Sequence, residues 1–194
     1  MPPSTLLVLG DSVAWGQGLL TENKFSTLVQ ENLNARGQTL TVTMLAHSGA
    51  TIGIRGPTLA SSDDGEVPVS FPTVVQQVAG FSGDPTDVAL ILLSGGINDV
   101  DIRRILNPLT NSRNLRHLIK QYCHNDMVTL LSEVTAKFSS PDLPVVVTGY
   151  FPILSADSHP LRIPFLLNMH GIGVPFFIDF PNVFAKIVSL SLSR

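Results

Sequence analysis

Short apolar runs alternate along this chain with longer segments in which apolar residues recur at three- and four-residue spacing. Four of the short runs end at turn-forming or polar residues: Thr5–Leu9, Leu40–Leu45, Val88–Leu93 and Pro144–Gly149. The longer segments have the period of an amphipathic helix. Strands that alternate with helices are typical of βαβ units, in which the strands run parallel. The pattern therefore predicts an α/β fold with a parallel sheet.

Three helical segments are predicted between these strands. The first ends at Gly37, and the second runs from Pro72 to Gly80. The third covers residues 112–138, as one helix or as two with a break near Asn125. The apolar faces of the first two consist of Phe25, Leu28, Val29 and Leu33, and of Phe71, Val74, Val75 and Val78. Pro72 suits the first turn of a helix, where its missing N–H loses no hydrogen bond.

Two further segments are predicted from local composition. Val174–Phe180 fits a fifth strand, although so short an apolar run fits a buried helix segment equally well. Residues 53–70 are rich in Gly, Pro, Ser and Asp and are predicted to form a loop.

Length and composition favour a single hydrophobic core. A chain of 194 residues, 44% of them hydrophobic and 14% charged, is long and apolar enough to bury a sizeable core. We therefore expect a single domain over residues 1–194.

Charge and cysteine content exclude several classes of partner. The net charge of −3 provides no basic surface for a phosphate backbone, so nucleic acid is not an expected partner. Cys123 is the single cysteine, so the chain cannot form an internal disulfide, which fits a reducing compartment. We expect Cys123 to be a small buried residue on a helix. The N-terminal run Leu6–Leu9 is too short for a signal peptide or a membrane span. We therefore expect a cytoplasmic protein without a membrane span.

Small or amide-bearing residues follow three of the predicted strands. Ser12 follows the first strand in LLVLGDS, Gly49 follows the second in AHSGAT, and Asn98 follows the third in GGIND. In an open parallel sheet, ligands bind beyond the carboxyl ends of the strands, where loop amides and helix N-termini converge. We therefore expect these three residues to lie at one edge of the sheet.

The three residue types suit acyl transfer. Ser12 offers a hydroxyl nucleophile and its own backbone N–H. Gly49 lets the backbone approach a substrate closely, so that its N–H can donate to a developing oxyanion, and Asn98 adds a neutral side-chain amide. Each such donor stabilises the transition state by roughly 3–4 kcal/mol. The prediction is a catalytic Ser12 with an oxyanion hole formed by Ser12, Gly49 and Asn98.

The same segments resemble the sequence blocks of the SGNH hydrolases, also called GDSL esterases and lipases. Gly10-Asp11-Ser12 matches the first block, Gly49 the second, and Gly96-Ile97-Asn98-Asp99 the third, G-x-N-D. The resemblance implies a flavodoxin-like three-layer α/β/α sandwich with a mainly parallel sheet of four to five strands. It also implies a serine esterase or lipase that cleaves small-molecule carboxylic esters through an acyl-enzyme, with no metal and no organic cofactor.

The fourth block of that family, D-x-x-H, does not occur in this sequence. Without a base to take its proton, a serine hydroxyl is a weak nucleophile at neutral pH. His159 in SADSHP comes nearest to the missing block, with Asp157 two residues before it instead of three. We expect the base to lie beyond Arg194, in a longer parent protein.

The other histidines are assigned ordinary positions. His170 suits the last turn of a helix, where a cation complements the helix dipole. His117 and His124 fall within the long predicted helix, as solvated or core-edge residues. His47 lies two residues before Gly49, which favours a structural role over a catalytic one.

Other roles stay open for the same motifs. If the base is absent, the pocket would bind acyl or acetyl groups without hydrolysis, as a non-catalytic relative of the same fold. A phosphoryl-transfer domain with Asp11 and Asp99 around a metal is disfavoured, because the sequence lacks the acidic pair and the lysine of such a site. We expect these two carboxylates to hold their loops in shape. Trp15 is expected either in the core or at the mouth of the pocket. The sequence does not identify the ester substrate or the oligomeric state.

Overall fold

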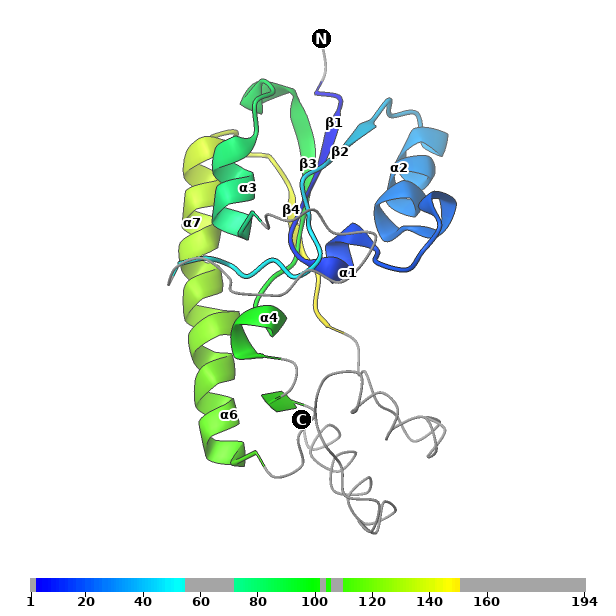
Figure 1. Ribbon diagram of the computed structural model, residues 1–194. Coiled ribbons are helices and arrows are strands. Elements are labelled where there is room, and N and C mark those ends of the chain that lie inside the picture. The colour runs from blue at the N-terminus through cyan, green and yellow to red at the C-terminus, as the bar shows by residue number, and fades with distance from the viewer. Residues whose placement is uncertain (1–2, 55–71, 102–103, 106–109, 151–194) are drawn as a thin grey trace. The chain divides into compact units, whose positions relative to one another are not determined.

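The computed structural model describes residues 3–54, 72–101, 104–105 and 110–150 (Figure 1). The chain divides into two compact units, Met1–Asp99 with Ile119–Gly149 and Val100–Leu118 with Tyr150–Arg194. The strands of the described residues all belong to the first unit. The predicted strand at Val174–Phe180 and most of the predicted loop at 53–70 lie outside the described residues, and the single domain over residues 1–194 stays a prediction.

Four strands of the first unit form one parallel sheet in the order β2-β1-β3-β4. They are β1 (Thr5–Leu9), β2 (Thr41–Met44), β3 (Val88–Leu93) and β4 (Val145–Val147). β1 pairs with β2 on one side and with β3 on the other, which places Leu7 beside Thr43 and Ile91. The predicted α/β fold is confirmed, and each of the four strands lies within the apolar run that predicted it.

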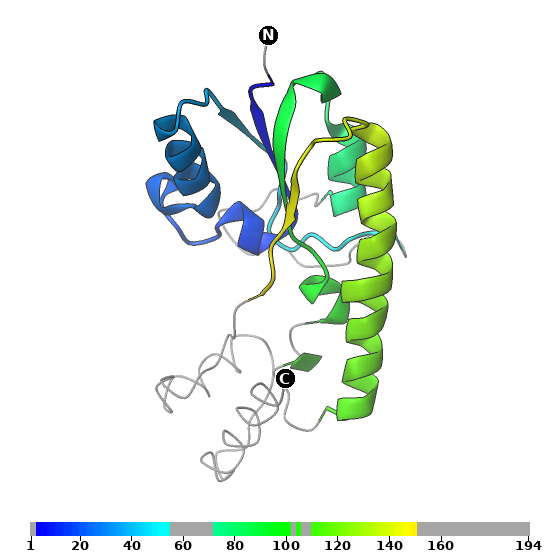
Figure 2. The same ribbon diagram turned by 180° about the vertical axis from the view of Figure 1, so that it is seen from behind.

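Helices cover both faces of the sheet, as the two opposite views show (Figures 1 and 2). α2 (Phe25–Ala35) lies on one face, and α3 (Val74–Gly80) and α7 (Met127–Lys137) lie on the other. Side chains of β1 alternate between the two layers: Leu6 and Val8 belong to the core cluster on the α2 side, and Leu7 and Leu9 to the other. This is the three-layer arrangement of a flavodoxin-like sandwich.

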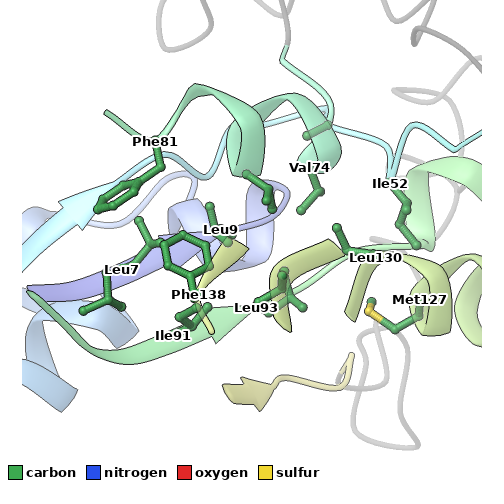
Figure 3. Packing of buried hydrophobic residues seen from close by; sticks show 14 residues of the cluster. Leu7, Leu9, Ile52, Val74, Phe81, Ile91, Leu93, Met127, Leu130 and Phe138 are labelled. Atoms are coloured by element: carbon green, nitrogen blue, oxygen red, sulfur yellow. The ribbon is translucent and has the colours of Figure 1, made fainter. Parts of the chain in front are cut away.

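The larger core cluster lies between the sheet and helices α3 and α7 (Figure 3). Phe81 and Phe138 pack at the ends of these two helices, with ring centroids 5.3 Å apart. Lys137, in the last turn of α7, donates from its Nζ to the carbonyl oxygens of Val78, Ala79 and Phe81 at 2.6, 2.9 and 3.0 Å. The Val78 carbonyl also accepts from the Phe81 N–H at 3.3 Å. The lysine adds a donor for the carbonyls at and just after the end of α3, so it caps this helix and joins the two helices.

The apolar face predicted for α2 is only half buried. Val29 and Leu33 pack against the core cluster on their side of the sheet. Phe25 and Leu28, however, are 44% and 51% exposed. α2 lies against β2, the edge strand of the described sheet, which offers a helix too narrow a surface to bury its whole stripe. Two of the four residues on the predicted apolar face are therefore not buried.

The start of α3 also differs from the prediction. Thr73 is the N-cap: its Oγ1 accepts from the Gln76 N–H at 3.2 Å, and the Gln76 Oε1 accepts from the Thr73 N–H at 2.9 Å. This reciprocal capping box satisfies two donors at the start of the helix. The helix therefore begins at Val74, and Pro72 precedes the cap instead of standing in the first turn.

The long predicted helix is divided into three pieces. α6 (Ser112–Ile119) belongs almost wholly to the second unit, and the π-helical segment η3 (Lys120–Asp126) precedes α7 in the first. η3 includes Asn125, and the helical conformation continues through it, so of the two alternatives the break near Asn125 does not occur. Its Cys123 is half-buried, and a Cβ added at Gly96 would lie 2.9 Å from the Cys123 Sγ. The loop after β3 therefore packs directly on the wider π-helical turn.

Short helical turns complete the described residues. They are α1 (Ser12–Trp15), η1 (Thr21–Asn23), η2 (Pro85–Asp87) and α4 (Ile97–Val100). In the second unit, Arg104 lies 4.0 Å from the carboxylate of Asp101, a partly exposed ion pair of small energetic value. Among the described helices, none has the length and apolar composition needed to cross a membrane.

Candidate active site at the carboxyl edge of the sheet

The loop after β1 turns at Gly10, where only glycine fits. Its φ of +138° is a backbone conformation that other residues rarely adopt. A Cβ at this position would collide with the Ser94 side chain and would lie 2.7 Å from the Ser94 carbonyl oxygen. The close approach of Gly10 to Ser94 brings the loops after β1 and β3 together directly before Ser12.

Asp11 holds this turn from inside. Its side chain is fully buried and caps α1, with Oδ1 accepting from the Val13 N–H at 3.0 Å. The same oxygen accepts from the Ser94 hydroxyl at 2.8 Å, and the Asp11 N–H donates to the Ser94 Oγ at 3.2 Å. Ser12 is then the first residue of α1 and is half-buried. The expectation that Asp11 shapes its loop is confirmed.

Gln77 of α3 supports the turn from the opposite side. This glutamine is only 3% exposed, and its amide brackets Gly10: Oε1 accepts from the Gly10 N–H at 2.7 Å, and Nε2 donates to the Gly10 carbonyl at 2.9 Å. The sequence analysis did not single out Gln77 or Ser94. A signal for Gln77 was present, because it lies three residues after Val74, on the apolar face of its helix.

The loop after β2 carries Gly49 in a tight turn. The Ala50 N–H donates to the His47 carbonyl at 3.1 Å, and Gly49, at the third position of this turn, has a φ of +78°. A positive φ at that position is the mark of a type II turn, which favours glycine. The His47 N–H donates to the Gly10 carbonyl at 2.9 Å, so this loop lies beside the serine turn.

The loop after β3 is bonded to the loop after β2 by two side chains. The Asn98 amide donates from Nδ2 to the Ala50 carbonyl at 2.8 Å. Asp99 accepts from the Ile52 N–H with both carboxylate oxygens, at 3.0 and 3.2 Å. Gly49 and Asn98 are therefore neighbours through Ala50. The side-chain amide of Asn98 has two N–H hydrogens, and the bond to the Ala50 carbonyl uses one of them.

Burial raises the pKa of Asp99 from the ordinary 3.8 to about 6. Loss of water around the carboxylate is the main cause, and the nearby carboxylates of Asp126 and Asp11 act in the same direction. The backbone N–H groups of Ile52 and Asp99 oppose the shift. The geometry confirms that Asp99 holds its loop in shape, and burial disfavours its charged form.

We expect Asp99→Asn to change how stability depends on pH. Because the folded pKa lies above the unfolded one, wild-type stability from this group is full below pH 3.8 and is lost as the pH rises through about 6. The variant lacks this loss, so its stability relative to wild type should rise by about 1–3 kcal/mol from pH 4 to pH 7.5. Urea unfolding at several pH values measures the difference.

Asp84→Asn is the control for this measurement. Hydrogen bonds from Thr86 lower the pKa of the exposed Asp84, so its pH-dependent contribution lies below about pH 4. The difference between this variant and wild type should therefore stay constant from pH 4 to pH 7.5. A constant difference for Asp99→Asn as well would show that burial does not shift this carboxyl.

Trp15 and His47 form a stacked pair next to the serine turn. Their ring centroids are 6.2 Å apart, with an angle of 21° between the ring planes. Lys24 lies over the Trp15 ring, with its Nζ 4.2 Å from the centroid. Trp15 also packs against the core cluster of Leu6 and Val8. Of the two expectations for Trp15, core packing is therefore confirmed.

The histidines divide by position. Of the five, the structure describes His47, His117 and His124. His124 is exposed on η3, with its Nδ1 3.0 Å from the Asn125 Oδ1, and His117 is exposed in the second unit. His159, the nearest match to the missing block, and His170 lie outside the described residues. Within the described ranges, no group of three or more His, Cys, Asp or Glu side chains could hold a metal ion.

Comparisons with known proteins add a distant structural likeness. No family model and no curated protein matches this chain. Two solved structures, both variants of the esterase AlinE4, are similar to it with TM-scores of 0.45. One is 16% identical, and the match covers 96% of this chain and 74% of that one. The other is 19% identical, with 94% and 83% covered. These values do not assign the chain to a family.

Proposed function

We propose that this chain is a serine hydrolase of the SGNH type, which cleaves carboxylic esters of small molecules. One observation carries the proposal: the loops with Gly10-Asp11-Ser12, Gly49 and Asn98 follow three neighbouring parallel strands and are hydrogen-bonded to one another. Such a convergence is where open α/β sheets bind ligands. It is also what the three sequence blocks require, since each supplies a different group to one reaction.

The proposed reaction runs through an acyl-enzyme on Ser12. The Ser12 Oγ attacks the ester carbonyl carbon, its proton passes to a base, and the carbonyl electrons move to oxygen. The N–H groups of Ser12 and Gly49 and the Asn98 amide stabilise this oxyanion. The alkoxide then leaves with a proton, and water repeats the sequence to release the acid. No metal or organic cofactor takes part in any of these steps.

The hydrogen bonds around the serine turn favour this chemistry over simple loop structure. Donors stabilise an oxyanion best when their positions are set before the reaction begins. Gln77, Asp11 and Ser94 are nearly or fully buried and hold the turn from two sides. Each therefore limits the movement of the backbone that carries Ser12.

Covalent labelling tests the proposal. A fluorophosphonate probe reacts with activated serine hydroxyls, and mass spectrometry locates the modified residue. We expect one label per folded chain, at Ser12, together with turnover of p-nitrophenyl acetate. Heat-unfolded protein is the control and should not label. A folded chain that neither labels at Ser12 nor turns over the ester, even with imidazole added as an external base, contradicts the proposal. Binding of acyl compounds by such a chain would support the non-catalytic alternative.

A further inference from the structure

Basic residues are concentrated in one short part of the chain. Residues 102–125 contain none of the 15 Asp and Glu residues, but five of the 12 Lys and Arg residues: Arg103, Arg104, Arg113, Arg116 and Lys120. The rest of the chain is therefore acidic. We propose that helix α6 uses this positive charge to bind the surface of an anionic phospholipid membrane. Such binding goes beyond the proposed hydrolysis and does not depend on it.

The charged and the apolar residues of this helix lie on opposite faces. Arg113, Arg116 and Lys120 follow one another at three- and four-residue spacing, which places them on one side of a helix. Lys120 is the first residue of η3, and the helical backbone of Ile119 (φ −59°, ψ −47°) continues the helix from α6 into η3. All three cations are exposed. The opposite face consists of half-buried apolar residues: Leu115, Leu118 and Ile119.

The three cations of this basic face have no partner among the described residues. Neither an ion pair nor a side-chain hydrogen bond joins Arg113, Arg116 or Lys120 to another residue of the described ranges. Other cations of these ranges are engaged within the fold: Lys24 lies over an aromatic ring, and Lys137 donates to three carbonyl oxygens. The charge of the basic face is therefore not used by the described part of the fold.

Helix stability does not account for this arrangement. Asn111 caps α6, with its Oδ1 accepting from the N–H groups of Arg113 and Asn114 at 2.9 and 3.2 Å. Arg113 therefore stands in the first turn, which holds no acidic residue and where the positive end of the helix dipole disfavours a cation. Arg116 and Lys120 are four residues apart and repel each other. An anionic surface against this face offsets both penalties.

A phospholipid surface fits this helix better than a nucleic acid does. A helix with one cationic and one apolar face lies in the headgroup region of a membrane, which accepts both kinds of side chain. A nucleic-acid site neutralises roughly six to ten phosphates, more than three cations can reach. Each Lys or Arg near an anionic membrane strengthens binding about fivefold, so that the three cations together contribute about 10²-fold.

Vesicle binding tests this assignment. The 194-residue chain is sedimented with vesicles of equal parts phosphatidylcholine and phosphatidylserine, and with vesicles of phosphatidylcholine alone. We expect binding to the anionic vesicles that weakens as salt is added, because salt screens the attraction. Replacing Arg113, Arg116 and Lys120 together by glutamine should weaken this binding about 10²-fold. Glutamine is a good helix former, so circular dichroism should show an unchanged fold.

Arg36→Gln is the matched control for Arg116→Gln. Arg36 is an exposed arginine at the end of α2, in the first unit. Loss of one charge should weaken binding to the anionic vesicles about fivefold at Arg116 and leave it unchanged at Arg36. Equal losses in the two variants overturn the assignment to α6. Absence of binding, or equal binding to neutral and anionic vesicles, overturns the inference as a whole.

Two further measurements identify the partner and separate this binding from hydrolysis. Duplex DNA or polyglutamate that competes with the anionic vesicles at equal charge concentration would replace the lipid by a general polyanion and overturn the choice of partner. Ser12→Ala should bind the vesicles like wild type, because Ser12 lies outside the basic face. A chain that binds the vesicles but lacks both labelling and ester turnover contradicts the proposed function alone and supports membrane binding.

Discussion

Replacing Ser12 by alanine should lower kcat/KM for p-nitrophenyl acetate by about 10⁴- to 10⁶-fold. The variant removes the hydroxyl that forms the acyl-enzyme and leaves the backbone N–H in place. Its fold should be preserved, because the bonds that hold the turn involve the Asp11, Ser94 and Gln77 side chains. Steady-state kinetics, with circular dichroism for folding, measures the effect.

Ser132→Ala is the matched control for this loss. Ser132 is an exposed serine on α7, with its hydroxyl bonded to the Val128 carbonyl of its own helix. The same change of side chain there should leave kcat/KM at the wild-type value. Equal activity of the Ser12 and Ser132 variants would remove Ser12 from the reaction and, with it, the proposed acyl-enzyme.

Gly10→Ala should lower the free energy of unfolding by about 2–5 kcal/mol. Two effects add: a positive φ disfavours any residue with a Cβ, and the new methyl group has no space beside Ser94. The Ser94 backbone cannot move without disturbing the end of β3, so the collision cannot be relieved cheaply. Urea unfolding, followed by circular dichroism, measures the change.

Gly37→Ala separates the two effects. Gly37 has a φ of +95°, and an added Cβ there would meet nothing within 4 Å. This variant should therefore lose only the conformational part, about 1–2 kcal/mol. If both variants lose the same stability, then the approach of Gly10 to Ser94 is not a tight contact, and the loops after β1 and β3 are less closely joined than described.

Strands were the most predictable part of this fold. The runs at Thr5–Leu9 and Val88–Leu93 became β1 and β3 with the same bounds, because a strand covered on both faces has a nearly continuous apolar run. The apolar face of α2 was predicted from the spacing of its apolar residues alone. This spacing does not show how far the sheet extends beneath the helix. Phe25 and Leu28 are exposed for that reason.

The candidate site was predictable as motifs and not as contacts. Ser12, Gly49 and Asn98 lie in the loops that follow three strands, so their placement at one edge follows from a parallel sheet. The hydrogen bond from Asn98 to Ala50 joins residues 48 positions apart in sequence. The role of Gln77 likewise depends on Gly10, 67 positions away. No local pattern encodes such pairs.

The sequence by itself determined the layered α/β fold and the segments that carry the chemistry, because hydrophobic period and turn residues act over short stretches of chain. Only the tertiary structure decided which polar groups hold those segments together: Gln77 around Gly10, Ser94 against Asp11, and Trp15 against His47. Packing brings these side chains within hydrogen-bonding or stacking distance. The partner of a buried polar group depends on what the whole fold places beside it.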